Sequence, residues 1–106
     1  MTKKAAREDA LSHLKKLTKR VKEESEKANP SPRVLRLKFE ELVAHRPVAI
    51  KANLSYLNSE ADDVVREEAD AEFDDALDKA EEAWDNAAGI LETLNAVLSE
   101  EDRRVD

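Results

Sequence analysis

The side chains in this sequence that could do chemistry are two histidines and a large number of carboxylates. His13 and His45 are the only imidazoles, and Glu41 precedes His45 by four residues, whereas di-iron helical bundles use a Glu-x-x-His spacing of three. A single glycine excludes a glycine-rich phosphate loop, and the lack of cysteine excludes disulfides and thiolate metal ligands. We therefore expect no enzyme, with no catalytic residue, cofactor or metal site.

The carboxylates cluster as sequence neighbours, as in Asp74-Asp75 and Glu81-Glu82. Both pairs fall on the solvated side of the apolar pattern described below. A run of charge in that position is typical of a helix face that contacts water. We interpret the acidic residues in this way.

Two helices must position the histidines. The first is predicted over about residues 2–28 and carries an apolar stripe in 3–4 spacing. It ends at Asn29-Pro30-Ser31-Pro32, because two prolines in three residues stop a helix. Ser31 followed by Pro32 offers a capping hydroxyl and a proline in the first turn, so the second helix is predicted over about residues 32–58.

Proline also lies inside the second predicted helix, at Pro47. It removes the bond to the Val43 carbonyl, but the preceding residues offer no loop chemistry, so we favour one helix kinked at Pro47 over two short helices. Asn53 begins a match to the glycosylation sequon and also lies near the apolar stripe. We favour a buried asparagine that fixes helix register.

The third helix is predicted over about residues 60–99, after a turn at Asn58-Ser59, where Ser59 and Asp62 resemble a capping box. Three positions per heptad are apolar, a stripe wide enough for two neighbours. The middle of the stripe is alanine, and Trp84 beside it either fills the core or forms a half-exposed hot spot. Because this helix is the longest, its ends, near Val64 and Val65 or toward Leu98, are a predicted docking surface. The interface candidates are Trp84, Leu91, Leu94, Val97 and Leu98.

Both connections between the predicted helices are short, which forces neighbouring helices to be antiparallel. The expected fold is all-α: an up-down-up antiparallel three-helix bundle, or coiled coil, with a long third helix. The chain has 106 residues, 41% charged and 4% aromatic, a composition typical of long solvated helices. We expect residues 1–106 to form a single helical domain from a longer chain.

The net charge of −7 is distributed unevenly. Residues 1–22 carry eight lysines and arginines against two acidic residues, and residues 59–106 carry eighteen acidic residues against four basic ones. This asymmetry favours a basic first helix beside acidic neighbours. RNA binding is the alternative, although residues 1–38 lack aromatic side chains that would stack on bases. The basic patch candidates are Lys15, Lys16, Lys19 and Arg20.

No apolar run approaches the roughly 20 residues that a membrane span needs, and the start of the chain lacks the apolar core of a signal peptide. We expect an intracellular, cytoplasmic protein with no membrane partner and no small-molecule substrate.

Three motifs follow one another along the chain. They are Leu14-Lys-Lys-Leu-Thr-Lys-Arg-Val21, Leu35-Arg-Leu-Lys-Phe-Glu-Glu-Leu42, and Glu68-Ala-Asp-Ala-Glu-Phe-Asp-Asp75 followed by Lys79 and Trp84-Asp85. Over about residues 10–98 this order resembles the N-terminal helical region of Gag-like polyproteins of BEL/Pao-type LTR retrotransposons, whereas Pro47 and the alanine run depart from that pattern. The resemblance implies an assembly protein that packages RNA and builds particles, with this segment as an oligomerising arm, and it carries over no catalytic residue.

The sequence thus favours a non-enzymatic structural module that self-associates through its helices, with a homo-oligomer as the expected partner arrangement. A monomeric adaptor that binds a partner helix is one alternative. RNA binding through the first helix is the other.

Overall fold

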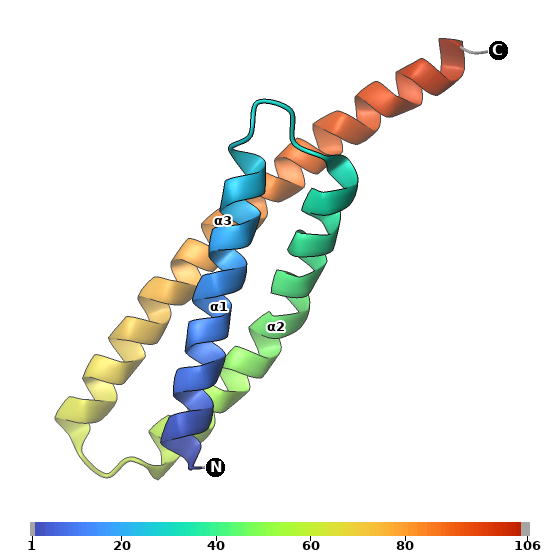
Figure 1. Cartoon of the computed structure of the whole chain (residues 1–106). Coiled ribbons are helices and arrows are strands. Elements are labelled where there is room, and N and C mark those ends of the chain that lie inside the picture. Colours follow the sequence, from blue (N-terminus) through green and yellow to red (C-terminus); the bar gives the residue numbers. More distant parts are fainter. Residues whose placement is uncertain (1, 105–106) are drawn as a thin grey trace.

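The computed structural model describes the backbone of residues 2–104 and the side chains of residues 2–94. This part of the chain forms three helices and no strand: α1 (Lys3–Ser25), α2 (Pro32–Ser59) and α3 (Asp63–Arg104). The helices run up, down and up, and each packs against the other two (Figure 1). The prediction of an all-α three-helix bundle is confirmed.

The connection from α1 to α2 is held by a buried carboxylate. α1 ends at Ser25, three residues earlier than predicted. The Glu24 side chain accepts a hydrogen bond from the Ser31 backbone N–H at 3.1 Å and pairs with Lys27 Nζ at 2.6 Å. The Lys27 hydrogen bond, followed by that of Ser31, lowers the pKa of Glu24, although burial opposes this shift. Glu24 therefore ties the following chain back to the end of α1.

α2 begins as predicted and continues through its internal proline. The Ser31 hydroxyl caps the helix by accepting from the Val34 N–H, and Pro32 is its first residue. Pro47 lies on the exposed side of α2, and the helix runs unbroken from Pro32 to Ser59. The prediction of one helix in place of two short ones is confirmed.

The connection from α2 to α3 differs from the predicted capping box. Ser59 is still part of α2, and its hydroxyl donates to the Tyr56 carbonyl at 2.8 Å. Asp62 caps α3 without it, because Asp62 Oδ1 accepts from the N–H groups of Val64 and Val65 at 2.9 and 3.2 Å. The predicted pairing of Ser59 with Asp62 is wrong, since a lone aspartate already satisfies the first free N–H groups of a helix.

The core combines large side chains from two helices with small ones from the third. α1 contributes leucines and a valine, and α2 contributes two leucines and an alanine. α3 contributes four alanines between Phe73 and Leu91. The buried core residues are Ala10, Leu11, Leu14, Leu17, Val21, Leu35, Leu42, Ala49, Phe73, Ala76, Ala80, Ala83, Ala87 and Leu91.

α3 is much longer than the helices that it packs against. It has 42 residues, whereas α1 has 23 and α2 has 28. At about 1.5 Å per residue, α3 spans nearly the whole long dimension of the molecule, 65 Å. Its C-terminal part continues alone beyond the connection between α1 and α2 (Figure 1). The helix extends to Arg104, past the predicted end at residue 99.

Candidate functional site: interaction surfaces of the bundle

A buried arginine joins all three helices at the end of the bundle where the chain begins. Arg7, on α1, is only 7% exposed. Its Nε donates to Asn53 Oδ1 of α2 at 3.0 Å, and its Nη2 donates to the Ala69 carbonyl of α3 at 2.7 Å. The guanidinium also lies 5.5 Å from the centre of the Tyr56 ring and 3.6 Å from the Glu72 carboxylate. Arg7 thus satisfies acceptors on two other helices at once.

Sequence reasoning treated the basic residues of the first helix as surface and missed Arg7. Its spacing indicates a position facing the core, since Arg7 precedes Leu14 by seven residues and so lies on the apolar stripe. Asn53 is buried, at 3% exposure, as its position near the stripe indicated. Its role in fixing register stays a prediction.

The two histidines meet at the contact between α1 and α2. The rings of His13 and His45 lie edge to face, with centres 4.5 Å apart. His45 Nε2 is 2.8 Å from the Ala10 carbonyl oxygen, which can only accept, so this nitrogen carries a proton. Among the described residues, no group of three or more histidines and carboxylates is placed to hold a metal ion.

His13 should make the fold sensitive to mild acid. His13 is exposed, but partial desolvation lowers its pKa below the ordinary value of 6.5, and His45, Lys16 and Arg20 add to the shift, with Glu41 opposing it. The folded chain then binds this proton less readily than the unfolded chain, so stability is present above pH 6.5 and declines below it. Between pH 7.5 and pH 5.5, the free energy of unfolding measured with urea should decline less in His13→Gln than in the parent chain. Equal declines in both proteins would contradict this role.

Trp84 lies half-buried on the outer side of the junction between α2 and α3. Its ring meets Phe39 edge to face, with centres 5.8 Å apart, and the Arg46 guanidinium lies 5.8 Å from the ring centre. Arg46 is itself held by Glu81 at 2.8 Å. Trp84 therefore packs against the core and keeps part of its ring accessible.

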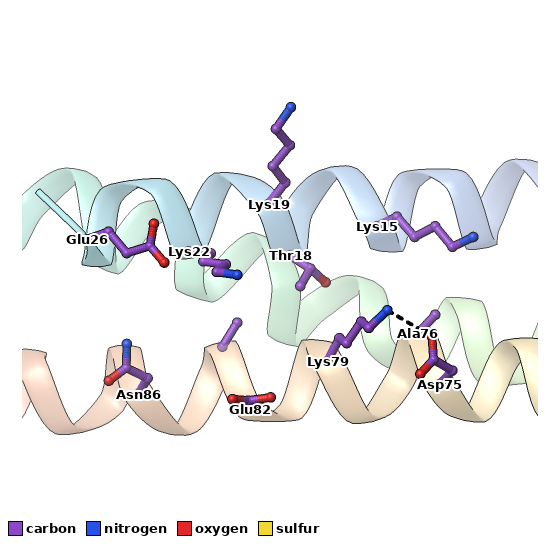
Figure 2. A pocket seen from close by; sticks show the side chains of 11 residues that line it. Lys15, Thr18, Lys19, Lys22, Glu26, Asp75, Ala76, Lys79, Glu82 and Asn86 are labelled. Atoms are coloured by element: carbon purple, nitrogen blue, oxygen red, sulfur yellow. Dashed lines mark ion pairs between the residues drawn. The ribbon is translucent and has the colours of Figure 1, made fainter.

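A groove runs between α1 and α3, with a volume of about 890 Å³. Figure 2 shows Lys15, Lys19 and Lys22 along α1 above the groove and residues of α3 below it. The small side chains Ala76 and Ala83 leave the space between the two helices open. The residues lining the groove are Lys15, Thr18, Lys19, Lys22, Glu26, Asp75, Ala76, Lys79, Glu82, Ala83 and Asn86.

The predicted basic patch divides around α1. Lys15, Lys16, Lys19 and Arg20 are all exposed. Lys15 and Lys19 line the groove. Lys16 and Arg20 lie on the side toward α2, where their charges lower the pKa of His13. Lys19 lies 3.9 Å from Glu23, and within the described residues the other three form no ion pair.

A second, shallower hollow of about 360 Å³ continues along α3 beyond the groove. It begins at Asp85 and Asn86 and ends at Thr93 and Leu94. Gly89 lies in its middle, and a Cβ atom added there would meet nothing within 4 Å. A helical glycine costs about 1 kcal/mol relative to alanine, and packing against the described residues does not account for it.

The structure places the predicted interface residues in different surroundings. Leu91 is a core residue, 8% exposed. Trp84 and Leu94 are half-buried. Val97 and Leu98 lie outside the residues whose side chains are described. At the other end of α3, Val64 and Val65 are exposed, and four more exposed aliphatic side chains lie on α2.

Comparison with known proteins adds no family to this picture. No protein-family model, curated protein or solved structure matches the chain. Within the described residues, no helix has the length and apolar character needed to cross a membrane. The surfaces of the bundle are therefore the candidate functional sites.

Proposed function

We propose that this chain is a non-enzymatic structural module that assembles by helix–helix self-association through α3. The observation that carries the proposal is the length of α3, which leaves its C-terminal part without a neighbour in the bundle (Figure 1). The resemblance of the motif order to Gag-like proteins supports a finer assignment, an oligomerising arm of a retrotransposon assembly protein.

A helix that protrudes into water lacks the packing that stabilises most helices in proteins. Most helical stability in proteins comes from packing an apolar face, and short isolated helices are marginal. Ile90 still packs against the core, the half-buried Leu94 follows it at the start of the protruding part of α3, and the 3–4 spacing continues in the sequence through Val97 and Leu98. A second helix against this face would supply the packing that α1 and α2 do not.

Sedimentation equilibrium of the full chain tests the proposal. The parent chain should associate with rising concentration, and Leu94→Asp should weaken association at least tenfold, since it places a charge in the contact. Leu54→Asp is the matched control, because Leu54 is exposed on α2 and outside both hollows. Circular dichroism establishes that both variants remain folded. A strict monomer at high concentration would refute self-association.

RNA binding is a second candidate, favoured by the exposure of the whole basic patch. Phosphate contacts of this kind weaken steeply as salt rises. Fluorescence anisotropy with a single-stranded RNA should then show strong binding at low salt, lost when Lys15, Lys16, Lys19 and Arg20 are changed to glutamate. Unchanged RNA affinity in that variant would dismiss this candidate.

A further inference from the structure

The two hollows form one groove along a single face of α3. The groove between α1 and α3 follows α3 from Asp75 to Asn86, and the second hollow continues from Asp85 to Leu94. Asn86 lines both hollows, so they meet at this residue. The groove-lining positions on α3 recur at helical spacing, at Asp75, Lys79, Glu82, Asn86, Gly89 and Thr93.

Gly89 lies on this face, in the part of α3 that α1 does not cover. Open space surrounds the position where its Cβ atom would be. Glycine inside a helix is costly, and it is used where another backbone must approach closely. Nothing in the described part of the chain approaches this position, so it leaves room for the backbone of another helix.

We propose that the groove is filled by the same face of α3 from a second copy, so that two α3 helices pack antiparallel about a two-fold axis at Gly89 and Ile90. A contact of this kind uses one surface twice and closes on itself. In this register Asn86 of one copy faces Thr93 of the other. Residues 93–104 of the second copy then lie along residues 75–86 of the first. The inference rests on the proposed self-association and specifies its geometry.

The length of α3 fits this register. The groove between α1 and α3 extends over residues 75–86 of α3, about 18 Å of helix. The segment from Thr93 to Arg104 has the same number of residues. In this register that segment of one copy spans the groove of the other, and each protruding helix becomes the fourth helix beside the other copy's bundle.

The charges along the register are self-complementary in sequence. The register places position 104, an arginine, opposite Asp75, and position 100, a glutamate, opposite Lys79. Asp75 and Lys79 already pair with each other at 3.0 Å, as the dashed line in Figure 2 shows. Asp75 and Lys79 of one copy and positions 100 and 104 of the other would thus form a network of four charges. The two-fold axis would repeat this network at the other end of the contact.

The α1 side of the groove carries further charges. Figure 2 shows Lys15 across the groove from Asp75 and Ala76, with Lys22 farther along the groove, and neither lysine forms an ion pair within the described residues. In this register the acidic run Glu100-Glu101-Asp102 lies opposite residues 77–79 of α3, and positions 103 and 104, both arginines, lie opposite Ala76 and Asp75. Raising the salt concentration should therefore weaken the dimer severalfold by screening these exposed charges.

Disulfide cross-linking tests the axis directly, because the chain contains no cysteine. Under mild oxidation Gly89→Cys should form a covalent dimer, since residue 89 of one copy lies beside residue 89 of the other. An equal mixture of Asn86→Cys and Thr93→Cys should form the mixed dimer while keeping Gly89. Asn86→Cys alone is the matched control: the two copies of residue 86 are separated by about seven residues of rise, too far for a disulfide.

A bulky residue at position 89 gives an independent measurement. Gly89→Leu should weaken dimerisation at least tenfold in sedimentation equilibrium. The thermal stability of the monomer should be maintained or raised, because the added side chain enters open space in the single chain. An unchanged dimerisation constant would overturn the inference.

The outcomes separate this inference from the proposed function. Self-association without the mixed Asn86–Thr93 cross-link would overturn the register and leave self-association standing. Self-linking of Asn86→Cys would overturn it in favour of a parallel pair. A chain that remains monomeric would refute both. A foreign helix in the groove would appear as a monomer whose Gly89→Cys variant forms no covalent dimer.

Discussion

Replacing Arg7 with alanine should lower the free energy of unfolding by about 3 kcal/mol, measured by urea denaturation. The change removes the donor to Asn53 Oδ1, which is buried, and the donor to the Ala69 carbonyl. A buried acceptor left without a partner costs roughly 1–3 kcal/mol. The packed aliphatic part of the arginine is lost as well. The effect is large because one side chain serves two helices other than its own.

Matched variants separate the parts of this effect. Glu72→Gln should cost less than about 1 kcal/mol, because the Glu72 side chain is 55% exposed and its ion pair with Arg7 is screened by water. The double variant Arg7→Met with Asn53→Leu should recover much of the lost stability, since it removes the donor and the stranded acceptor together. If Arg7→Ala unfolds as easily as the double variant, or Glu72→Gln costs as much as Arg7→Ala, the account of this cluster is wrong.

The helices were predictable from the sequence because their signals are local. The proline pair around Ser31 sets one connection, and the lack of loop chemistry around Pro47 indicates a continuous α2. The observed helix ends differ from the predicted ones where a side chain forms a contact that was not predicted. Glu24 folds the chain back onto α1, and Asp62 caps α3 by itself. A pattern of apolar residues does not reveal such contacts, since they depend on where a neighbouring segment arrives.

The interaction surfaces were less predictable for a different reason. An apolar face has the same spacing whether it meets its own chain or another one. Leu91 is therefore part of the core, although its spacing also suits an interface. The alanine run lies in the middle of a stripe predicted to meet two neighbours, and the structure adds that Ala76 and Ala83 line a groove beside α1. The charge of Arg7 predicted an exposed side chain. A basic residue on an apolar stripe is buried when hydrogen-bond acceptors on neighbouring helices pair with it.

Replacing Leu14 with alanine should destabilise the bundle by about 3–4 kcal/mol, within the 2–5 kcal/mol range of buried leucine truncations. Leu14 is fully buried, at 0% exposure, and belongs to the cluster in which α3 contributes mainly alanines. A cavity is less costly when large neighbours can move into it. Alanines cannot extend into the space, so little relaxation is expected.

Leu37→Ala is the matched control, because the same atoms are removed from a leucine that is 54% exposed on α2. It should change the free energy of unfolding by less than about 0.5 kcal/mol. A second variant, Leu14→Ala with Ala80→Leu, tests the role of the small residues, since a larger side chain from α3 should restore part of the loss if it reaches the cavity. If Leu14→Ala lowers the free energy of unfolding by less than about 1 kcal/mol, the core relaxes into the cavity despite the alanines. The pairing of large side chains on α1 and α2 with small ones on α3 would then not determine stability.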